Sequence, residues 1–265
     1  MRTTIITLVA ALGLMATASA GAQEGTGTVT VIHGVPGLTV DVYVNGDATL
    51  TGFEPGTITD PLQLPPGDYE LAVREAGSAP DSDPAISGSA TLEAGQNVSI
   101  VAHLDAGGQP TLTVFANDTS QIEAGQSRVT VRHTAAAPAV DVLAGGEPLI
   151  SGLENPNEET ATVPAGSYPV AVAAAGTTDP VIGPTDLALE AGTAYAVYAT
   201  GSLEAGNLDL LVQTWDGLGA APSGVAAGTD GLAASGLPAW VAVLMAFGAV
   251  LVLGSTVAVA RGRRW

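Results

Sequence analysis

The sequence predicts an all-β protein made of two tandem antiparallel β-sandwich domains, followed by a C-terminal transmembrane helix. Three observations support this fold class. One segment occurs twice at a spacing of about 100 residues, apolar and polar residues alternate in short runs within both copies, and a long apolar stretch lies near the C-terminus. Because alternation with a period of two is typical of half-buried strands, both copies are expected to form sheets.

The repeat is clearest at the start of each copy. Residues 29–46 are VTVIHGVPGLTVDVYVNG and residues 129–146 are VTVRHTAAAPAVDVLAGG, with eight of 18 positions identical. Two further pairs align: LPPGDYELAV (64–73) with VPAGSYPVAV (163–172), and LEAGQNVSIVA (92–102) with LEAGTAYAVYA (189–199). The offset stays between 97 and 100 residues, so the two copies are expected to superpose. The core residues expected to coincide are Val31, Val42 and Val73 with Val131, Val142 and Val172.

Turn residues divide each copy into short strands. Asn45-Gly46 and Gly145-Gly146 favour two-residue hairpins, because both central residues of such a turn adopt positive φ. The PPGDY and PAGSY segments are interpreted as turns that open into strands. A helical fold is excluded between the two ends, since the chain's 34 glycines and 17 prolines interrupt every window long enough for a helix.

The N-terminus has the pattern of a secretory signal peptide. Arg2 precedes an apolar run over residues 5–16, and small residues follow, with expected cleavage near Ala20 or Ala22. A buried N-terminal helix is the alternative interpretation.

The C-terminus has the pattern of a membrane anchor. Residues 237–260 carry no charge, and as a helix these 24 residues would rise about 36 Å, which exceeds the ~30 Å hydrocarbon core of a bilayer. Arg261, Arg263 and Arg264 follow, and basic flanks stay on the cytoplasmic side. The repeats are therefore expected outside the cell. A removable anchor is the alternative, although no LPxTG-like tetrapeptide precedes the span.

These patterns together predict the organisation of the chain. Its expected parts are a signal peptide (1–22), a first β-sandwich (23–118), a linker (119–126), a second β-sandwich (127–216), a Gly/Ala/Ser-rich stalk (217–236), a transmembrane helix (237–260) and a basic cytoplasmic tail (261–265). The predicted location is the cell membrane, crossed once, with extracellular domains and a cytoplasmic C-terminus. The linker is expected to couple the two domains only weakly.

Composition narrows the function classes. Cysteine is absent, which excludes disulfides, thiol nucleophiles and thiolate metal sites. The chain contains 26 acidic residues against seven basic ones, a formal net charge of −19. Such a charge repels nucleic acid and anionic surfaces, so neither is an expected partner. A solvated acidic surface is favoured over a specific cation-binding role.

The repeated segments resemble a known family. VTVIHGVPGLTVDVYVNG, LPPGDYELAV and LEAGQNVSIVA are similar to the secreted bacterial repeat catalogued as domain of unknown function 4397, over nearly all of residues 27–216 and in two copies. The second copy departs from the family pattern at VDVLAGG, which replaces VDVYVNG. The resemblance implies a cell-surface or secreted β-sandwich of immunoglobulin-like or prealbumin-like type. It implies no activity.

Two residues with chemical potential recur in both copies. His33 and Asp41 recur as His133 and Asp141, eight residues apart in each copy. The functional interpretation is a His–Asp pair that acts as a base or a metal ligand. The structural interpretation is that the His closes its strand with a hydrogen bond while the Asp caps a loop. We prefer the structural interpretation, because no third partner recurs in both copies.

The remaining candidates are weak. Asp81 and Asp83, two positions apart in PDSDP, offer hard oxygen ligands to Ca²⁺, but the counterpart GTTDP keeps only Asp179. A solvated acidic loop is therefore favoured. G-x-S-x-G and a Walker lysine are both absent. No catalytic, cofactor-binding or metal-binding residue is assigned, and no cofactor is expected.

The sequence therefore predicts a non-catalytic cell-surface module of a bacterial envelope, anchored in the membrane and used for binding, for adhesion or as a spacer. The alternative is an envelope enzyme or metal-binding protein that uses one of the two His–Asp pairs. The expected partners are the membrane and an unidentified extracellular protein or polysaccharide. A cluster of Tyr43, Phe53 and Trp215 on one face would mark a binding patch.

The predicted topology is testable on intact protoplasts. Added proteinase should degrade residues 23–236 and spare the tail after residue 260, because only the former are expected outside. Immunoblots against the two regions measure the outcome, with detergent-lysed protoplasts as the control. Protection of residues 23–236 before lysis would contradict the topology.

Overall fold

The computed structural model describes residues 25–220. The predicted signal peptide, transmembrane helix and basic tail lie outside these residues, as does most of the predicted stalk. The described residues form sixteen β-strands. Among them, no helix is long and apolar enough to cross a membrane.

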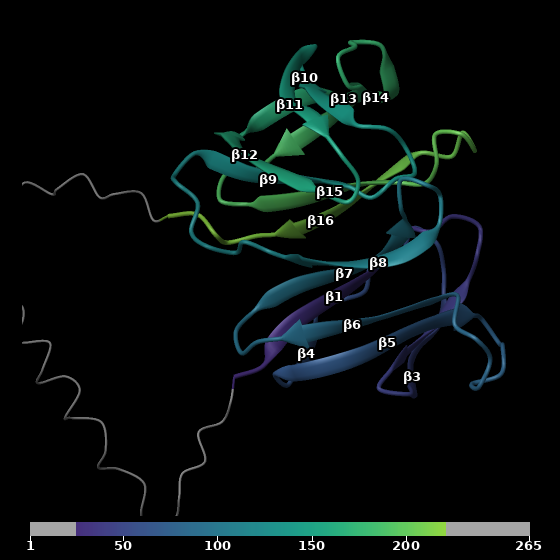
Figure 1. The fold of residues 1–265 in the computed structure, drawn as a ribbon. Helices are drawn as coiled ribbons and strands as arrows, with labels where there is room; N and C mark the ends of the chain where they lie inside the picture. The colour runs from purple at the N-terminus through teal and green to yellow at the C-terminus, as the bar shows by residue number, and fades with distance from the viewer. Residues whose placement is uncertain (1–24, 221–265) are drawn as a thin grey trace, which may run out of the picture. The chain divides into compact units, whose positions relative to one another are not determined.

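The first sandwich consists of two four-stranded sheets packed face to face (Figure 1). One sheet has the order β4-β1-β7-β8, with bounds Leu62–Leu64, Gly27–His33, Asn97–Leu104 and Pro110–Ala116. The other has the order β3-β2-β5-β6, with bounds Asp47–Phe53, Val40–Val44, Gly67–Glu75 and Ile86–Leu92. The chain crosses between the two sheets four times, after β1, β3, β4 and β6.

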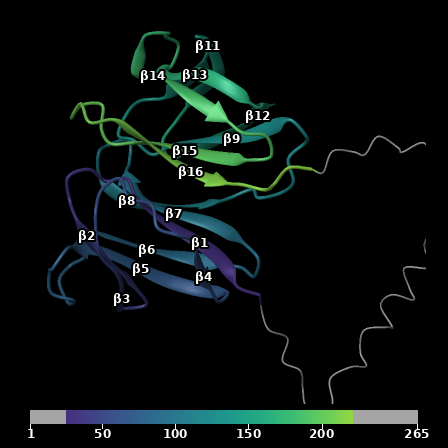
Figure 2. The same ribbon diagram turned by 180° about the vertical axis from the view of Figure 1, so that it is seen from behind.

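The second sandwich repeats the first strand for strand (Figure 2). Its first sheet has the order β12-β9-β15-β16, with bounds Glu158–Pro164, Gln126–His133, Ala194–Thr200 and Asp209–Trp215. Its second sheet has the order β11-β10-β13-β14, with bounds Glu147–Leu153, Val140–Ala144, Gly166–Ala174 and Pro180–Leu189. The identical strand order confirms that the repeated sequence encodes one fold twice.

One strand pair in each domain differs from the expected antiparallel arrangement. β1 pairs with β7 in parallel, and β9 pairs with β15 in parallel. Parallel neighbours need a long crossover, and here the crossover contains the whole of the opposite sheet. The order also differs from the immunoglobulin one, in which the first, second, fourth and fifth strands share a sheet. The immunoglobulin strand order is therefore not observed in either described sandwich.

The local predictions are confirmed. Asn45 and Gly46 have φ of 53° and 89°, and Gly145 and Gly146 have φ of 63° and 87°, as a type I′ hairpin turn requires. The six valines expected in the cores all pack there, although Val31 is only half-buried. Alternation of the inward side chains therefore predicts the core of each sandwich correctly.

The two sandwiches pack closely against each other, so the expectation of weak coupling is wrong. Every residue of β15 is buried, as is every residue of β7 after Asn97. Ile32, Val101 and Phe115 of the first domain form one core cluster with Ala196 and Tyr198 of the second. The physical reason is that the outward positions of the central strands include apolar side chains such as Ile32, Val101 and Ala196, so both faces of these strands need cover.

Arg132 is the largest fully buried side chain of this interface, with 1% of its surface exposed. Its Nε donates to Glu158 at 2.7 Å, and its Nη1 donates to the hydroxyl of Tyr198 at 2.6 Å. Its Nη2 donates to the carbonyl of Ala116 in the first domain at 3.3 Å. The guanidinium also lies 4.6 Å from the ring centroid of Phe115. These partners compensate for burying a charge between the domains.

Arg132→Ala should lower the free energy of unfolding by about 3 kcal/mol, because it removes a buried guanidinium with its hydrogen bonds and leaves a void between the domains. Arg132→Met keeps most of the volume and should cost about 1 kcal/mol. Arg128, whose partner Asp118 is 59% exposed, supplies the control, and Arg128→Ala should cost about 1 kcal/mol or less. Urea unfolding of the full chain measures all three. Equal losses for the two alanine variants would contradict the role of Arg132.

Candidate functional site

Each recurring histidine fastens the loop that follows the first strand of its domain. Nε2 of His33 lies 2.8 Å from the carbonyl oxygen of Leu38. Because a carbonyl only accepts, Nε2 carries the proton. The ring stacks on Phe53, with centroids 5.7 Å apart. His133 repeats the contact, with Nε2 2.9 Å from the carbonyl oxygen of Pro138.

The recurring aspartates hold two other loops. Asp41 accepts hydrogen bonds from the amides of Gly52 at 2.8 Å and Gly77 at 3.0 Å, and Asp141 repeats both contacts at 2.7 and 2.8 Å. The amide of Gly77, and next that of Gly52, hold the pKa of Asp41 below its usual value, while burial acts in the opposite direction. The two residues of each predicted pair therefore have separate partners, as the structural interpretation expects.

All three histidines are buried. His103 donates from Nδ1 to the carbonyl of Leu104 at 2.9 Å, and its Nε2 lies 2.8 Å from the hydroxyl of Thr113. Burial lowers the pKa of His33, His103 and His133, because the charged imidazolium loses more hydration than the neutral ring. Hydrogen bonds to backbone carbonyls offset part of that effect.

The three aromatic residues considered as a binding patch lie apart. Tyr43 is buried, with the guanidinium of Arg74 4.6 Å from its ring centroid. Phe53 is buried inside the first sandwich, and Trp215 packs at the interface between the domains. The patch hypothesis is therefore wrong, because each ring has a separate packing partner.

The acidic loop between β5 and β6 leaves Asp81 and Asp83 exposed. Within residues 25–220, no group of three or more His, Asp or Glu is placed to hold a metal ion.

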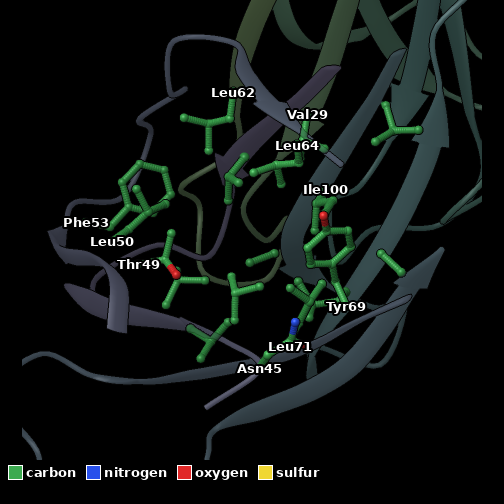
Figure 3. Close-up of a pocket in the computed structure, with 18 of the residues that line it drawn as sticks. Val29, Asn45, Thr49, Leu50, Phe53, Leu62, Leu64, Tyr69, Leu71 and Ile100 are labelled. Atoms are coloured by element: carbon green, nitrogen blue, oxygen red, sulfur yellow. The ribbon is translucent and has the colours of Figure 1, made fainter. Parts of the chain in front are cut away.

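The first sandwich contains a cavity that the sequence analysis did not find. It has a volume of about 250 Å³ and lies between the two sheets (Figure 3). Its wall is almost entirely aliphatic and aromatic. The side chains that dominate it are Leu50, Phe53, Leu62, Leu64, Leu71 and Ile100. Small-molecule sites are usually concave and mostly apolar, as this space is, and its volume lies just below their usual range of about 300–1,000 Å³.

The cavity opens along the edge between β3 and β4. Three of its exposed lining residues, Asn45, Asp47 and Thr49, lie on β3 and on the turn before it, and a fourth, Thr91, lies on β6. Leu62 and Leu64 of β4 line the opposite side and are half-buried. The mouth is therefore polar on one side and apolar on the other.

Pro61 interrupts the pairing along this edge, which resumes where Ile58 bridges to Ile32. β4 pairs with β1 over only three residues, and Pro61 precedes it without an N–H to continue the ladder. Thr160 occupies the equivalent position in the second domain and pairs with Thr130, so β12 continues over seven residues. β12 also contacts β11 more extensively than β4 contacts β3. In the second sandwich the pairing along this edge is therefore uninterrupted from Glu158 to Pro164.

A tyrosine fills the corresponding space in the second domain. Val98 pairs with Val29 in β1, and the residue that pairs with Val129 in the same way is Tyr195. Tyr195 is buried in the second core, and its hydroxyl accepts a hydrogen bond from the amide of Glu190 at 2.9 Å. A pocket near His133 in this domain holds only about 20 Å³.

The cavity is costly if it stays empty. At ~24 cal/mol per Å³, an enclosed void of 250 Å³ would lower stability by about 6 kcal/mol, which is the upper bound for this open cavity and a large part of the 5–15 kcal/mol typical of a domain. The second domain avoids this cost with one larger side chain. Retention of the space in the first domain therefore marks it as the candidate functional site.

The chemistry of the wall favours binding over catalysis. Tyr69 is half-buried, with its hydroxyl bonded to the carbonyl of Pro65 at 2.6 Å, and Asp47 is exposed at the mouth. His33 is the only imidazole of the wall, and its Nδ1 has no hydrogen-bond partner in the described structure. A single imidazole without an adjacent carboxylate or nucleophile does not form an acid–base pair.

Comparison with known proteins identifies one family. Its description, "Domain of unknown function (DUF4397)", applies to two matches, residues 27–143 and 134–227. This confirms the resemblance of the repeated segments. The first match extends past β8 into β10, whereas the structure divides the domains between Ala116 and Gln126. No curated protein matches the chain.

The three buried histidines predict a pH-dependent stability. Their pKa values are lowered in the folded state, so only the unfolded chain takes up protons as the pH falls below about 6.5. The free energy of unfolding should be constant above pH 7.5 and should then fall, by up to about 1.4 kcal/mol per pH unit for each imidazole. Asp41 acts separately, because its contribution is lost only as the pH falls below about 4.

Urea unfolding of the full chain between pH 8 and 5 measures this slope. His103→Asn should reduce the slope by about one third, because it removes one of three linked protons. A stability that is flat between pH 7 and 5 would show that the imidazoles protonate freely in the folded protein.

Proposed function

The chain belongs to the family of the domain of unknown function DUF4397, and from that premise we propose that it is a non-catalytic binding module of a bacterial envelope. The predicted anchor at residues 237–260 holds it in the membrane, and the two sandwiches lie outside. The family description assigns no activity, so the argument for binding comes from the site.

One observation carries the proposal: the open, apolar cavity of the first domain. It is large enough for a ligand group and is retained although the same fold can be filled, as Tyr195 fills the second domain. Its wall brings together neither a carboxylate pair nor an activated nucleophile. Binding without conversion is the use that fits such a wall.

The interface between the domains supports a presenting role for the second sandwich. Ser99 of the first domain donates to Gln213 of the second at 2.9 Å, and Tyr198 donates to the same oxygen at 2.8 Å. Arg132 joins both domains in the same buried region. These contacts fix the first domain, with its ligand site, in position on the second domain. A pure spacer does not need such a fixed orientation.

An alternative function as an enzyme or metal-binding protein has one observation in its favour. His33 lines the cavity, and its Nδ1 is buried without a hydrogen-bond partner. An unprotonated imidazole nitrogen can coordinate a metal ion or accept a proton as a base. Against this, Asp41 uses both carboxylate oxygens on backbone amides, so it does not assist His33.

The proposal is tested with the full chain in phospholipid vesicles. The vesicles are incubated separately with labelled protein and polysaccharide fractions of the host envelope, and retained material is measured after sedimentation. We expect saturable retention from one fraction, with the retained component chemically unchanged. His33→Gln removes the one imidazole that lines the cavity, and it serves to test the alternative function.

Each other result contradicts the proposal in a distinct way. Retention no greater than that of protein-free vesicles would favour a spacer. Conversion of the retained component, or one equivalent of zinc that is lost in His33→Gln, would favour the alternative. Metal content is measured by elemental analysis of the same vesicles.

A further inference from the structure

The size of the first-domain cavity limits what it can hold. Apolar cavities of ~150 Å³ stay dry and accept benzene. On that scale, 250 Å³ accommodates about ten carbon atoms. The wall formed by Phe53, Leu64, Leu71 and Ile100 offers no charged partner, so the inserted group is a hydrocarbon.

The residues at the mouth restrict the charge that the head group of the ligand can carry. Asp47 places a carboxylate there, and none of the arginines of the described chain lines the cavity. Asn45 accepts a hydrogen bond from the amide of Glu70 through Oδ1, which leaves its Nδ2 as a donor beside the opening. An anionic head group meets repulsion at this mouth, whereas a neutral or cationic one is accommodated.

We infer that the first domain binds the alkyl chain of an amphiphile with a neutral or cationic head group. The chain enters between β3 and β4, and the head group stays beside Asn45 and Asp47. This inference rests on the proposed binding function and names the ligand class of that site. The second domain does not share the property, because Tyr195 occupies the equivalent space.

The test uses the full chain in phospholipid vesicles and a decanol with a photoreactive diazirine at the end of its chain. After irradiation, proteolysis and mass spectrometry locate the label. We expect label on residues 47–64 and 97–104 of the first domain, and none on their second-domain equivalents 147–163 and 194–201. The second domain is the control within the same molecule, and label on 237–260 is not scored.

Two variants close the cavity by different means. The double variant Gln96→Thr with Val98→Tyr reproduces the arrangement around Tyr195, and labelling should fall by about tenfold or more. Thr49→Trp covers the mouth and leaves the core unchanged, with the same expected loss. Near-ultraviolet circular dichroism shows that each variant is folded. Tyr195→Val should do the reverse and bring label into the second domain.

Competition identifies the head group and the source of the chain. Unlabelled decan-1-ol and decylamine should suppress labelling, whereas decanoate should not. A second preparation carries the diazirine on the acyl chain of the vesicle phosphatidylcholine. Labelling from that lipid would assign the chain to a membrane lipid, and labelling only from free decanol would assign it to a soluble amphiphile.

Three outcomes would overturn the inference: equal labelling of the two domains, labelling that persists in both folded closure variants, or stronger competition by decanoate than by decan-1-ol. Envelope material retained by a protein whose cavity is not labelled would overturn this inference alone. Loss of both retention and labelling would overturn the proposed function as well.

Discussion

The structure depends on two central strands that have no solvent face, one in each of two sheets. β7 and β15 lie at the centre of these sheets, with a sandwich core on one side and the other domain on the opposite side. Every side chain on them must therefore be apolar or have a polar partner. Ser99 meets this requirement through Gln213, and Arg132 meets it through Glu158 and Tyr198. The remaining layers are built outward from this shared interface.

The two copies have diverged to complement each other across that interface. The positions occupied by Ile32 and Val101 in the first domain carry Arg132 and Tyr198 in the second. Two identical copies would place either four apolar side chains or two buried guanidinium groups between the sheets. With two different copies, the guanidinium of Arg132 instead lies over the aromatic rings of Phe115 and Tyr198 and forms an ion pair with Glu158. Divergence of the second copy is thus a consequence of pairing as well as of filling its own core.

Features governed by local rules were predictable from the sequence, and features governed by contact between distant segments were not. Asn45-Gly46 specifies its hairpin turn, and the repeat offset specifies two like domains. The parallel pairing of β1 with β7 is invisible to a pattern of alternation, which is the same for either strand direction. Thr30 and Ile32 alternate along β1 with the core residues Val29 and Val31, yet both are also buried. The cavity arises because a smaller side chain stands in the first domain than in the second. The signal in the sequence was the alignment of Val98 with Tyr195.

The cavity and the interface are energetically connected. β1 and β7 supply Val29, Val31 and Ile100 to the cavity wall, and their alternate residues are held against the second domain. An empty space on one side of a sheet weakens the packing that keeps its strands in place. Burial of the opposite face of β1 and β7 against the second domain supplies packing contacts to these strands without filling the cavity. The second domain therefore allows the first to keep a hollow core, which an isolated sandwich of this size would have to fill or lose stability.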